Sequence, residues 1–364
     1  MRFRKLLIGI FLVFLLGLEV LIKAGNVTPF LFQVLFNKNI ELNHSNPDSI
    51  NILLLGIGGG NHEGAKLSDT IILANINLKN QKINLISLPR DIWIKELNGK
   101  INSAYQIGDD KKKGDGLVLA KSVVDEVTGQ DPDYGAVIDF SGFVKAVDLM
   151  GGIDINVDNT FDDYQYPIDG KEADPCGHTS SEISKFTATD SAEADLPGFF
   201  PCRYIHVHFT KGMTHMNGET ALEYVRSRHA QGDEGTDFAR SKRQEKIIKA
   251  IFQKAVSLQI LTNPAKIFGL YSTLQSSVQT DVPQNQFDDF IKLAQKFGSA
   301  KINSVVIDYG DPVTNRPGLL MNPPIQSKYN YEWILVPRTG NFDEISSYVN
   351  CELTGGNCQI APSP

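Results

Sequence analysis

Three arginines of this 364-residue chain stand where they could hold phosphate oxygens. Arg226 and Arg228 lie at alternate positions at the end of one predicted helix, and Arg240 lies in the first turn of the next. Guanidinium groups are planar double donors, and a helix N-terminus offers unpaired N–H groups and a favourable dipole, so both match phosphoryl oxygens. The stretch predicts a phosphate or pyrophosphate site, with a solvated basic face as the ordinary alternative.

The two predicted helices determine where these arginines point. The first begins after Asn217, and the second begins after Thr236, a good N-cap, once the glycine-flanked loop 232–235 has ended the first. At 100° per residue, Arg240 and Gln244 continue an apolar stripe of the second helix. That stripe consists of Arg240, Gln244, Ile247, Ile251 and Ala255, and the opposite face consists of Lys242, Glu245, Lys246 and Lys249.

A charge on a core-facing stripe is costly unless it is paired. For a single arginine, the ordinary partner of Arg240 is Asp237, three residues earlier, or a carboxylate elsewhere in the fold. The neighbouring Arg226 and Arg228 favour a bound anion instead. Arg240 and Gln244 are therefore candidate ligands of that anion.

A second group of polar residues borders two predicted strands. Asp69 enters one strand, and Arg90 and Asp91 leave the next, so the three are expected to share one rim of a sheet. Singly, each is more often a helix cap or a salt-bridge partner. Lys100 and Asn102 follow closely and add donors, unless they form only a turn into a helix.

Other catalytic arrangements are not supported. Gly-x-Ser-x-Gly is absent, and His206, His208 and His215 have no acidic partner that the sequence identifies and no zinc spacing. The glycine run 56–60 lacks Gly-Lys-Ser/Thr and is followed by a strand, which indicates a turn or a pocket edge. Arginines, aspartates and a glutamine suit phosphoryl chemistry assisted by a divalent ion.

The elements that must position these residues alternate between strands and helices. We expect strands at residues 51–55, 70–77, 82–88, 134–140, 153–157, 304–308 and 333–336, the first of them central. We expect helices near residues 117–127, 142–150, 237–258, 287–297 and 342–349. This order predicts an α/β or α+β fold with a central mixed sheet flanked by helices.

Residues 6–22 are apolar and follow Arg2, Arg4 and Lys5, which predicts an uncleaved membrane helix with a cytoplasmic N-terminus. A cleaved signal peptide is the alternative, but no clear cleavage site follows. We divide the chain into an anchor at 1–25, a connector at 26–48, a core at 49–258 and a C-terminal part at 259–364 that completes the same domain. Everything after the anchor is expected outside the cytoplasm, and a net charge of −7 disfavours nucleic-acid binding.

Four cysteines on an exported chain favour disulfides. Cys351 and Cys358 could close a small loop, and Cys176 and Cys202 would then clamp the polar insertion at 158–215, although sequence alone does not determine the connectivity. The insertion is either a lid or acceptor-binding loop or a surface ornament.

With these residues assembled, the chain resembles the LytR-CpsA-Psr family, membrane-anchored enzymes that transfer glycopolymers from a polyprenyl-pyrophosphate carrier to the bacterial cell wall. The motifs are SDTIIL at 68–73, ISLPRDIWI at 86–94, KINSAY at 100–105, YGAVIDFSGFVKAVDLMGGIDINV at 134–157, GETALEYVRSR at 218–228 and DFARSKRQ at 237–244. They cover roughly residues 49–255.

The resemblance implies that an arginine cluster and Gln244 hold the pyrophosphate, that Asp69 helps to bind Mg²⁺, and that the lipid lies in an apolar tunnel between sheet and helices. The implied cluster consists of Arg90, Arg226, Arg228 and Arg240, with Lys100 and Asn102 as further donors. Asp91 or Asp69 is the candidate base. Gly58 stands where family members usually carry an acid, so either metal binding is weaker or His62 or Glu63 substitutes.

The expected partners are a polyprenyl-pyrophosphate-linked glycan and a peptidoglycan or other wall acceptor. Two other functions use the same residues: a polyprenyl-pyrophosphate hydrolase, and a non-catalytic lipid-pyrophosphate binder or envelope sensor, the sense in which the family is called a transcriptional attenuator.

Overall fold

The computed structural model describes residues 39–60, 64–187, 197–255, 257, 269–270, 277–310 and 316–360. The predicted membrane helix at residues 6–22 lies outside this part, as do His62 and Glu63. Within these ranges, no helix combines the length and the apolarity that crossing a membrane requires. The chain forms two units, Met1–Asn43 with Val282–Ser299, and His44–Asp281 with Ala300–Pro364.

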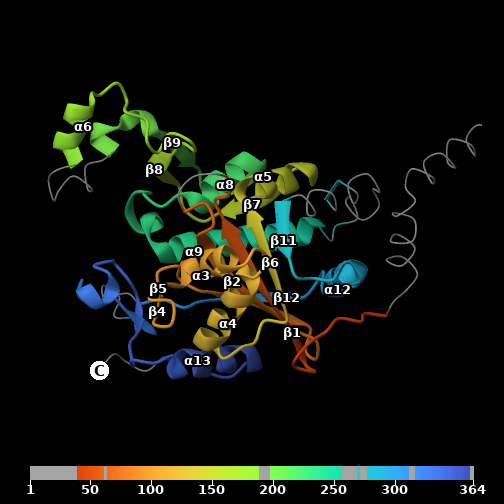
Figure 1. Cartoon of the computed structure of the whole chain (residues 1–364). Coiled ribbons are helices and arrows are strands. Elements are labelled where there is room, and N and C mark those ends of the chain that lie inside the picture. Colours follow the sequence, from red (N-terminus) through yellow and green to blue (C-terminus); the bar gives the residue numbers. More distant parts are fainter. Residues whose placement is uncertain are drawn as a thin grey trace, which may run out of the picture. The chain divides into compact units, whose positions relative to one another are not determined.

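The larger unit is built on a six-stranded mixed sheet (Figure 1). Its order is β11 (Val278–Thr280), β6 (Tyr134–Asp139), β1 (Ser49–Ile57), β2 (Ser68–Asn77), β3 (Lys82–Ser87) and β12 (Lys301–Val306). β1 runs parallel to β6 and β3 runs parallel to β12, whereas the other neighbours are antiparallel. The predicted mixed sheet and the central position of its first strand are confirmed.

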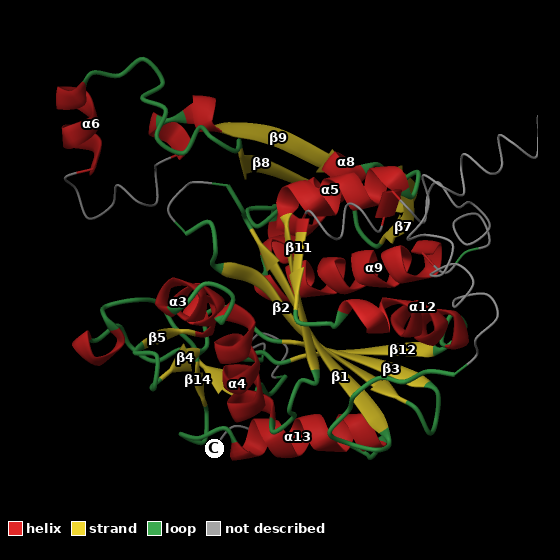
Figure 2. Cartoon of the chain, turned by 45° about the vertical axis from the view of Figure 1, so that its right-hand side comes forward, coloured by secondary structure: helices red, strands yellow, loops and turns green. Residues whose placement is uncertain are grey.

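Helices cover both faces of this sheet (Figure 2). On one side lie α4 (Gly116–Thr128) and α13 (Asp343–Thr354), whose apolar residues join those of β1, β2 and β3 in one core. On the other side lies α9 (Asp237–Ala255), next to β12. The sheet is therefore buried on both faces, which explains why its central strands are apolar nearly throughout.

A row of asparagines crosses four strands of the sheet. Asn75 Nδ2 donates to Asn51 Oδ1 at 2.8 Å, Asn84 donates to Asn75 at 3.4 Å, and Asn303 donates to Asn84 at 3.2 Å. These residues lie directly opposite one another in the register of β1, β2, β3 and β12. A one-residue slip of any strand would leave buried amides unpaired, so the row specifies the register.

A second core lies beyond the sheet. It unites α5 (Phe140–Leu149), β7 (Ile153–Val157), β10 (Gly212–Met216) and α8 (Gly218–Arg226) with the ribbon of β8 (Phe161–Pro167) and β9 (Tyr204–Phe209). The predicted strand at 153–157 therefore pairs with β10 instead of joining the main sheet.

The predicted insertion contains the β8–β9 ribbon, the helix α6 (Ser180–Thr187) and the 3-10 helix η2 (Pro201–Arg203). Cys176 is bonded to Cys202, and Cys351 is bonded to Cys358, so both suggested disulfides are confirmed. His215 belongs to β10, beside the second core.

Shorter elements complete the larger unit. These are β4 (Trp93–Ile94), β5 (Gly99–Lys100), η1 (Ile101–Ser103), α3 (Ala104–Lys111), η3 (Gly232–Gly235), β13 (Leu320–Met321), η5 (Ser327–Tyr329) and β14 (Val336–Pro337). The predicted strand at 333–336 is largely wrong: Val336 belongs to β14 and pairs with β13, whereas Leu335 forms a separate parallel bridge with Ile92, so the segment divides its pairing between two partners.

In the smaller unit, η4 (Gln284–Gln286) leads into α12 (Phe287–Lys296). The buried Lys292 Nζ lies 2.7 Å from Asp288, 2.9 Å from Asp289 and 3.1 Å from the carbonyl of Asn39, so this charge is fully partnered.

Candidate functional site

The candidate site is a cavity of about 610 Å³ in the larger unit. The cavity lies at the edge of the sheet where β3 and β12 end. β2 begins at the same edge, because it runs antiparallel to β3. The start of α9 and the segment 308–310 form further walls. Crevices outside the carboxyl ends of strands are common ligand sites in open α/β sheets.

Asp69, Arg90 and Asp91 meet at this cavity, as the sequence predicts. Arg90 Nη1 lies 2.5 Å from Asp69 Oδ1, and Arg90 Nε lies 3.5 Å from Asp91 Oδ2. Asp91 is buried and also binds Lys100 Nζ at 3.1 Å. Lys100 in turn lies 3.3 Å from Glu332, outside the cavity lining.

Asn102 supports this rim through its backbone. Its N–H donates to the carbonyl of Arg90 at 3.2 Å, and the residue is buried outside the cavity lining. Lys100 and Asn102 therefore hold Arg90 and Asp91 in place, instead of facing the cavity themselves.

Arg240 and Gln244 line the cavity from the first two turns of α9. Thr236 caps this helix, because its Oγ1 accepts the N–H of Ala239 at 3.2 Å. Arg240 is buried, as the stripe predicts, whereas Gln244 is half-buried. The side chain of Asp237, the ordinary partner considered for Arg240, lies outside the described part of the chain.

Sequence reasoning missed Arg243, which also lines the cavity. It is 2% exposed and donates to the carbonyls of Tyr224 at 2.9 Å, Glu234 at 2.8 Å and Ser227 at 2.6 Å, and to the Glu234 carboxylate at 2.8 Å. Burial lowers the pKa of Arg243, and the neighbouring Arg240 acts in the same direction. Arg243 therefore ties the end of α8 and the loop η3 to α9.

The side chain of Arg226 lies outside the cavity lining, among two aromatic rings and a carboxylate. Its guanidinium lies 4.2 Å from the ring centre of Phe140 and 5.4 Å from that of Tyr166. Its Nη2 lies 2.9 Å from Asp169 of the segment after β8. Although burial opposes the charge, the Asp169 carboxylate and Tyr166 raise the pKa of Arg226, so the group is held as a cation outside the cavity lining.

Arg228 is partly buried and also lies outside the cavity lining. Its backbone N–H donates to Asp163 Oδ2 at 3.1 Å, as do His229 N–H at 3.1 Å and Ser227 Oγ at 2.7 Å. Asp163 is completely buried on β8, so the ribbon holds the turn that carries Arg228.

The predicted exposed face of α9 needs a correction at Glu245. This side chain is buried, because α9 packs between the sheet on one side and the second core on the other. Burial raises its pKa, and Ser304 of β12 and Ser87 of β3 act against that rise. Ser87 also lines the cavity, which places Glu245 directly behind it.

A bidentate ion pair forms another wall. Arg316 donates to Asp308 from both terminal nitrogens, at 3.1 and 2.6 Å, and both residues line the cavity. Neither stood out in the sequence, because each is an isolated charged residue eight positions from its partner and neither belongs to a recognisable motif.

The carboxylates at the sheet edge fit a divalent cation, because Mg²⁺ prefers oxygen ligands. Asp69 is the best placed: its Oδ1 meets Arg90, and among the described residues its Oδ2 has no hydrogen-bond partner. Gly58 directly follows β1, and Asp139, the last residue of β6, lies in register with Ile57. At the edge of the sheet where Gly58 follows β1, the adjacent strand β6 therefore ends in an acid, Asp139.

Comparisons with known proteins agree with this geometry. A model of the LytR-CpsA-Psr family matches residues 33–319. A Bacillus cereus protein named polyisoprenyl-teichoic acid–peptidoglycan teichoic acid transferase TagU is 26% identical over 257 residues, 69% of this chain and 66% of the relative. The TagU of Enterococcus faecalis is 27% identical over 271 residues, 72% of this chain and 71% of the relative. The chain thus spans about two thirds of these relatives' length.

Solved structures share the fold. The crystal structure of B. subtilis TagV superposes with a TM-score of 0.55 at 22% identity, over 85% of this chain and 98% of TagV. A structure described as TagT bound to LIIa-WTA gives a TM-score of 0.53 at 20% identity, over 87% of this chain and 96% of TagT. The family prediction and the predicted mixed α/β architecture are confirmed.

Proposed function

The chain belongs to the LytR-CpsA-Psr family, and from this premise we propose that it is a phosphotransferase that moves a glycopolymer from a polyprenyl-pyrophosphate carrier to a wall acceptor. The relatives named above are teichoic acid transferases, which supports this enzyme class. The observation that carries the proposal is the joint presence of Arg90, Arg240, Gln244 and Asp69 in one cavity at the edge of the sheet.

In this assignment the cationic groups bind the diphosphate. Arg90 and Arg240 donate to its oxygens, and Gln244 adds an amide donor from the next turn of α9. The first turn of α9 contributes its dipole and its N–H groups. Charge gathers on the bridging and leaving oxygens during phosphoryl transfer, and fixed donors stabilise that charge without reorganisation.

Mg²⁺, when bound, would neutralise further phosphate charge. Asp69 is the proposed ligand, and Asp139 is the second carboxylate that this edge of the sheet offers in place of Gly58. Arg90 and Asp69 neutralise each other in the free protein. Arg90 would hold a phosphate oxygen and Asp69 would hold the cation when both are bound, because each is then matched to a group of opposite charge.

Three other predicted residues act on the binding groups indirectly. Asp91 lies between Arg90 and Lys100 and orients both. The proton of the acceptor hydroxyl would go to Asp91 or to Asp69, whichever carboxylate does not hold the cation. Arg226 and Arg228 lie outside the cavity lining, at the end of α8 that Arg243 joins to α9.

The carrier lipid requires a site close to a bilayer. The predicted anchor at residues 6–22 would keep the domain at the outer face of the cell membrane, and confinement there raises the effective concentration of a lipid-linked substrate. The apolar groups that line the cavity, among them Ile71, Leu88 and Ile307, offer a surface for the first isoprene units.

The test uses the full chain in detergent with a short polyprenyl-pyrophosphate glycan, peptidoglycan fragments and Mg²⁺. Glycan attached to the acceptor is the measured product. Arg240→Lys keeps the charge but loses the planar fork, and removal of one such donor typically lowers kcat by roughly 10²–10³. Arg203→Lys is the matched control, because Arg203 binds the carbonyl of Asp174 and stacks on Phe200 inside the insertion.

The products separate the alternatives. Attachment that EDTA and Arg240→Lys abolish, and that Arg203→Lys spares, establishes the transferase. Release of glycan phosphate without attachment makes the protein a hydrolase, and tight binding without turnover makes it a lipid-pyrophosphate binder or sensor.

A further inference from the structure

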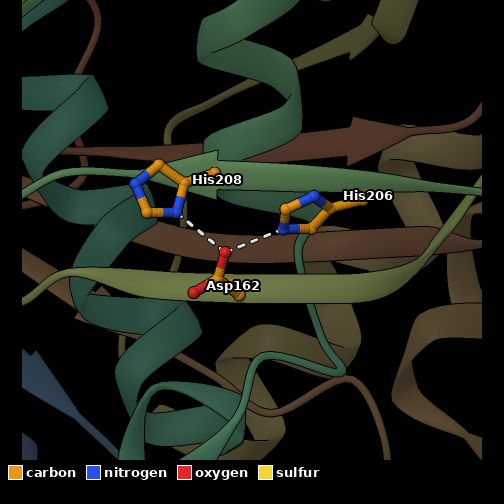
Figure 3. Close-up of side chains that lie close together, drawn as sticks. All are labelled: Asp162, His206 and His208. Atoms are coloured by element: carbon orange, nitrogen blue, oxygen red, sulfur yellow. Dashed lines mark hydrogen bonds and ion pairs between the residues drawn. The ribbon is translucent and has the colours of Figure 1, made fainter.

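Three side chains of the β8–β9 ribbon converge on one point away from the cavity (Figure 3). Asp162 Oδ1 lies 2.7 Å from His206 Nε2 and 2.8 Å from His208 Nδ1. Both rings turn their nitrogens toward the same carboxylate oxygen. We propose that Asp162, His206 and His208 form a surface site for a late first-row divalent cation, and specifically for Zn²⁺.

The strand geometry creates this arrangement. His206 and His208 are two residues apart on β9, so they stand on one face of the ribbon. Asp162 lies directly opposite His208 in the antiparallel register. Asp162 and His208 therefore come from directly paired backbone, and His206 lies on the same strand at the β-bulge that follows. Ligands carried by strands are held more precisely than ligands carried by loops.

The donor set suits zinc better than magnesium. Two imidazole nitrogens and one carboxylate oxygen match the ligands of open zinc sites, whereas Mg²⁺ prefers oxygen alone. Tetrahedral ligands about 2.1 Å from zinc lie about 3.4 Å apart. The present nitrogen-to-oxygen separations of 2.7 and 2.8 Å need to widen only slightly to admit the ion.

The surroundings already fix both rings. The ring of Tyr164 stacks on His206 with centroids 4.2 Å apart and an interplanar angle of 7°. His208 Nε2 lies 3.1 Å from Thr210 Oγ1, whose hydroxyl can accept from that nitrogen once Nδ1 binds a metal.

The chain contains a matched control with one ligand fewer. His215 Nδ1 lies 2.8 Å from Asp154 Oδ1 across β10 and β7, and both side chains are exposed. The other candidate group, Asp174 with Cys176 and Cys202, lacks available thiolates because its cysteines are bonded to each other. A histidine pair at Asp162 is thus what distinguishes the proposed site.

The test measures Zn²⁺ affinity of the full chain in detergent by competition with a chromophoric chelator, in Mg²⁺-containing buffer. One Zn²⁺ per chain is expected for the wild type. His206→Gln and His208→Gln should each weaken binding at least roughly tenfold, since even the loss of an outer-sphere partner typically costs 10- to 100-fold. Co²⁺ should give the visible absorption of a four-coordinate ion, which a merely structural histidine would not produce.

His215→Gln must leave both readouts unchanged, and thermal unfolding must show that all three variants are folded. Absence of Zn²⁺ binding by the folded wild type, or equal loss in His215→Gln and His206→Gln, would overturn the site. Because zinc binding is measured without glycan transfer, failure here is distinguishable from failure of the proposed transferase.

Discussion

Arg243→Ala should destabilise the protein more than any substitution on the exposed part of α9. The guanidinium makes four hydrogen bonds of 2.6–2.9 Å, three of them to backbone carbonyls at the end of α8 and in η3. Its Cζ also lies 4.9 Å from the ring centre of Phe161. Alanine leaves those carbonyls buried without their donors and removes the charge that faces Glu234.

The expected cost follows from the burial of the pair. Breaking a buried ion pair by removing one partner typically costs about 3–5 kcal/mol, and hydrogen bonds to charged groups are worth about 1.5–3 kcal/mol each but do not add fully. Glu234 is 17% exposed and can regain water, so we expect about 4 kcal/mol. At about 2–4 °C per kcal/mol, the melting temperature should fall by about 8–16 °C.

The assay is thermal unfolding of the full chain followed by near-ultraviolet circular dichroism. Lys242→Ala, at the exposed neighbouring position, is the control and should stay within about 0.5 kcal/mol of wild type. Arg243→Lys should recover part of the loss, because one ammonium cannot reach Tyr224, Ser227 and Glu234 together. A melting temperature for Arg243→Ala within the error of Lys242→Ala would refute the assigned role.

Three further outcomes are expected. Glu245→Gln should stabilise the protein relative to the wild type, and increasingly so as pH rises above 4.5. Burial raises the pKa of Glu245 in the folded protein, so above pH 4.5 the carboxyl ionises more readily in the unfolded chain and the wild type loses stability. A difference in urea midpoints that does not change with pH would contradict this. Asn75→Ala should cost about 2–4 kcal/mol by leaving Asn51 Oδ1 and Asn84 Nδ2 without their partner in the sheet, and an unchanged urea midpoint would refute that role. Asp69→Asn should raise the Mg²⁺ concentration needed for half-maximal transfer, whereas a lower maximal rate at unchanged Mg²⁺ dependence would reassign Asp69 to proton transfer.

Local signals predicted the elements that position the cavity. Asn217 accepts Thr220 N–H at the start of α8, and Thr236 caps α9, as these residue types suggest. The apolar runs predicted five of the six strands of the main sheet and missed the three-residue β11, and the short turn at 78–81 between β2 and β3 explains why Asp69 and Arg90 share one rim. The domain boundaries, the metal and the roles of the arginines stay predictions.

Periodicity failed where a helix is covered on more than one side. α9 packs on the sheet and on the second core, so Glu245 and Arg243 are both buried although only one stripe was expected to be. A hydrophobic stripe identifies one buried face, and it cannot identify a second face that is filled by partnered polar groups. Three of the four acceptors that satisfy Arg243 are backbone carbonyls, which any residue type supplies, and only the Glu234 carboxylate is a side-chain partner.

His206 and His208 show that spacing along the sequence does not reveal a partner on another strand. His206 and His208 offered no metal spacing, because their third partner lies 44 and 46 residues away on β8. Only the cross-strand register brings Asp162 opposite His208. The next residue, Asp163, points into the core and holds the backbone of Arg228 and His229. Successive residues of one strand thus serve two faces, so a cation bound at Asp162 would stiffen the same strand that positions the arginine-bearing turn.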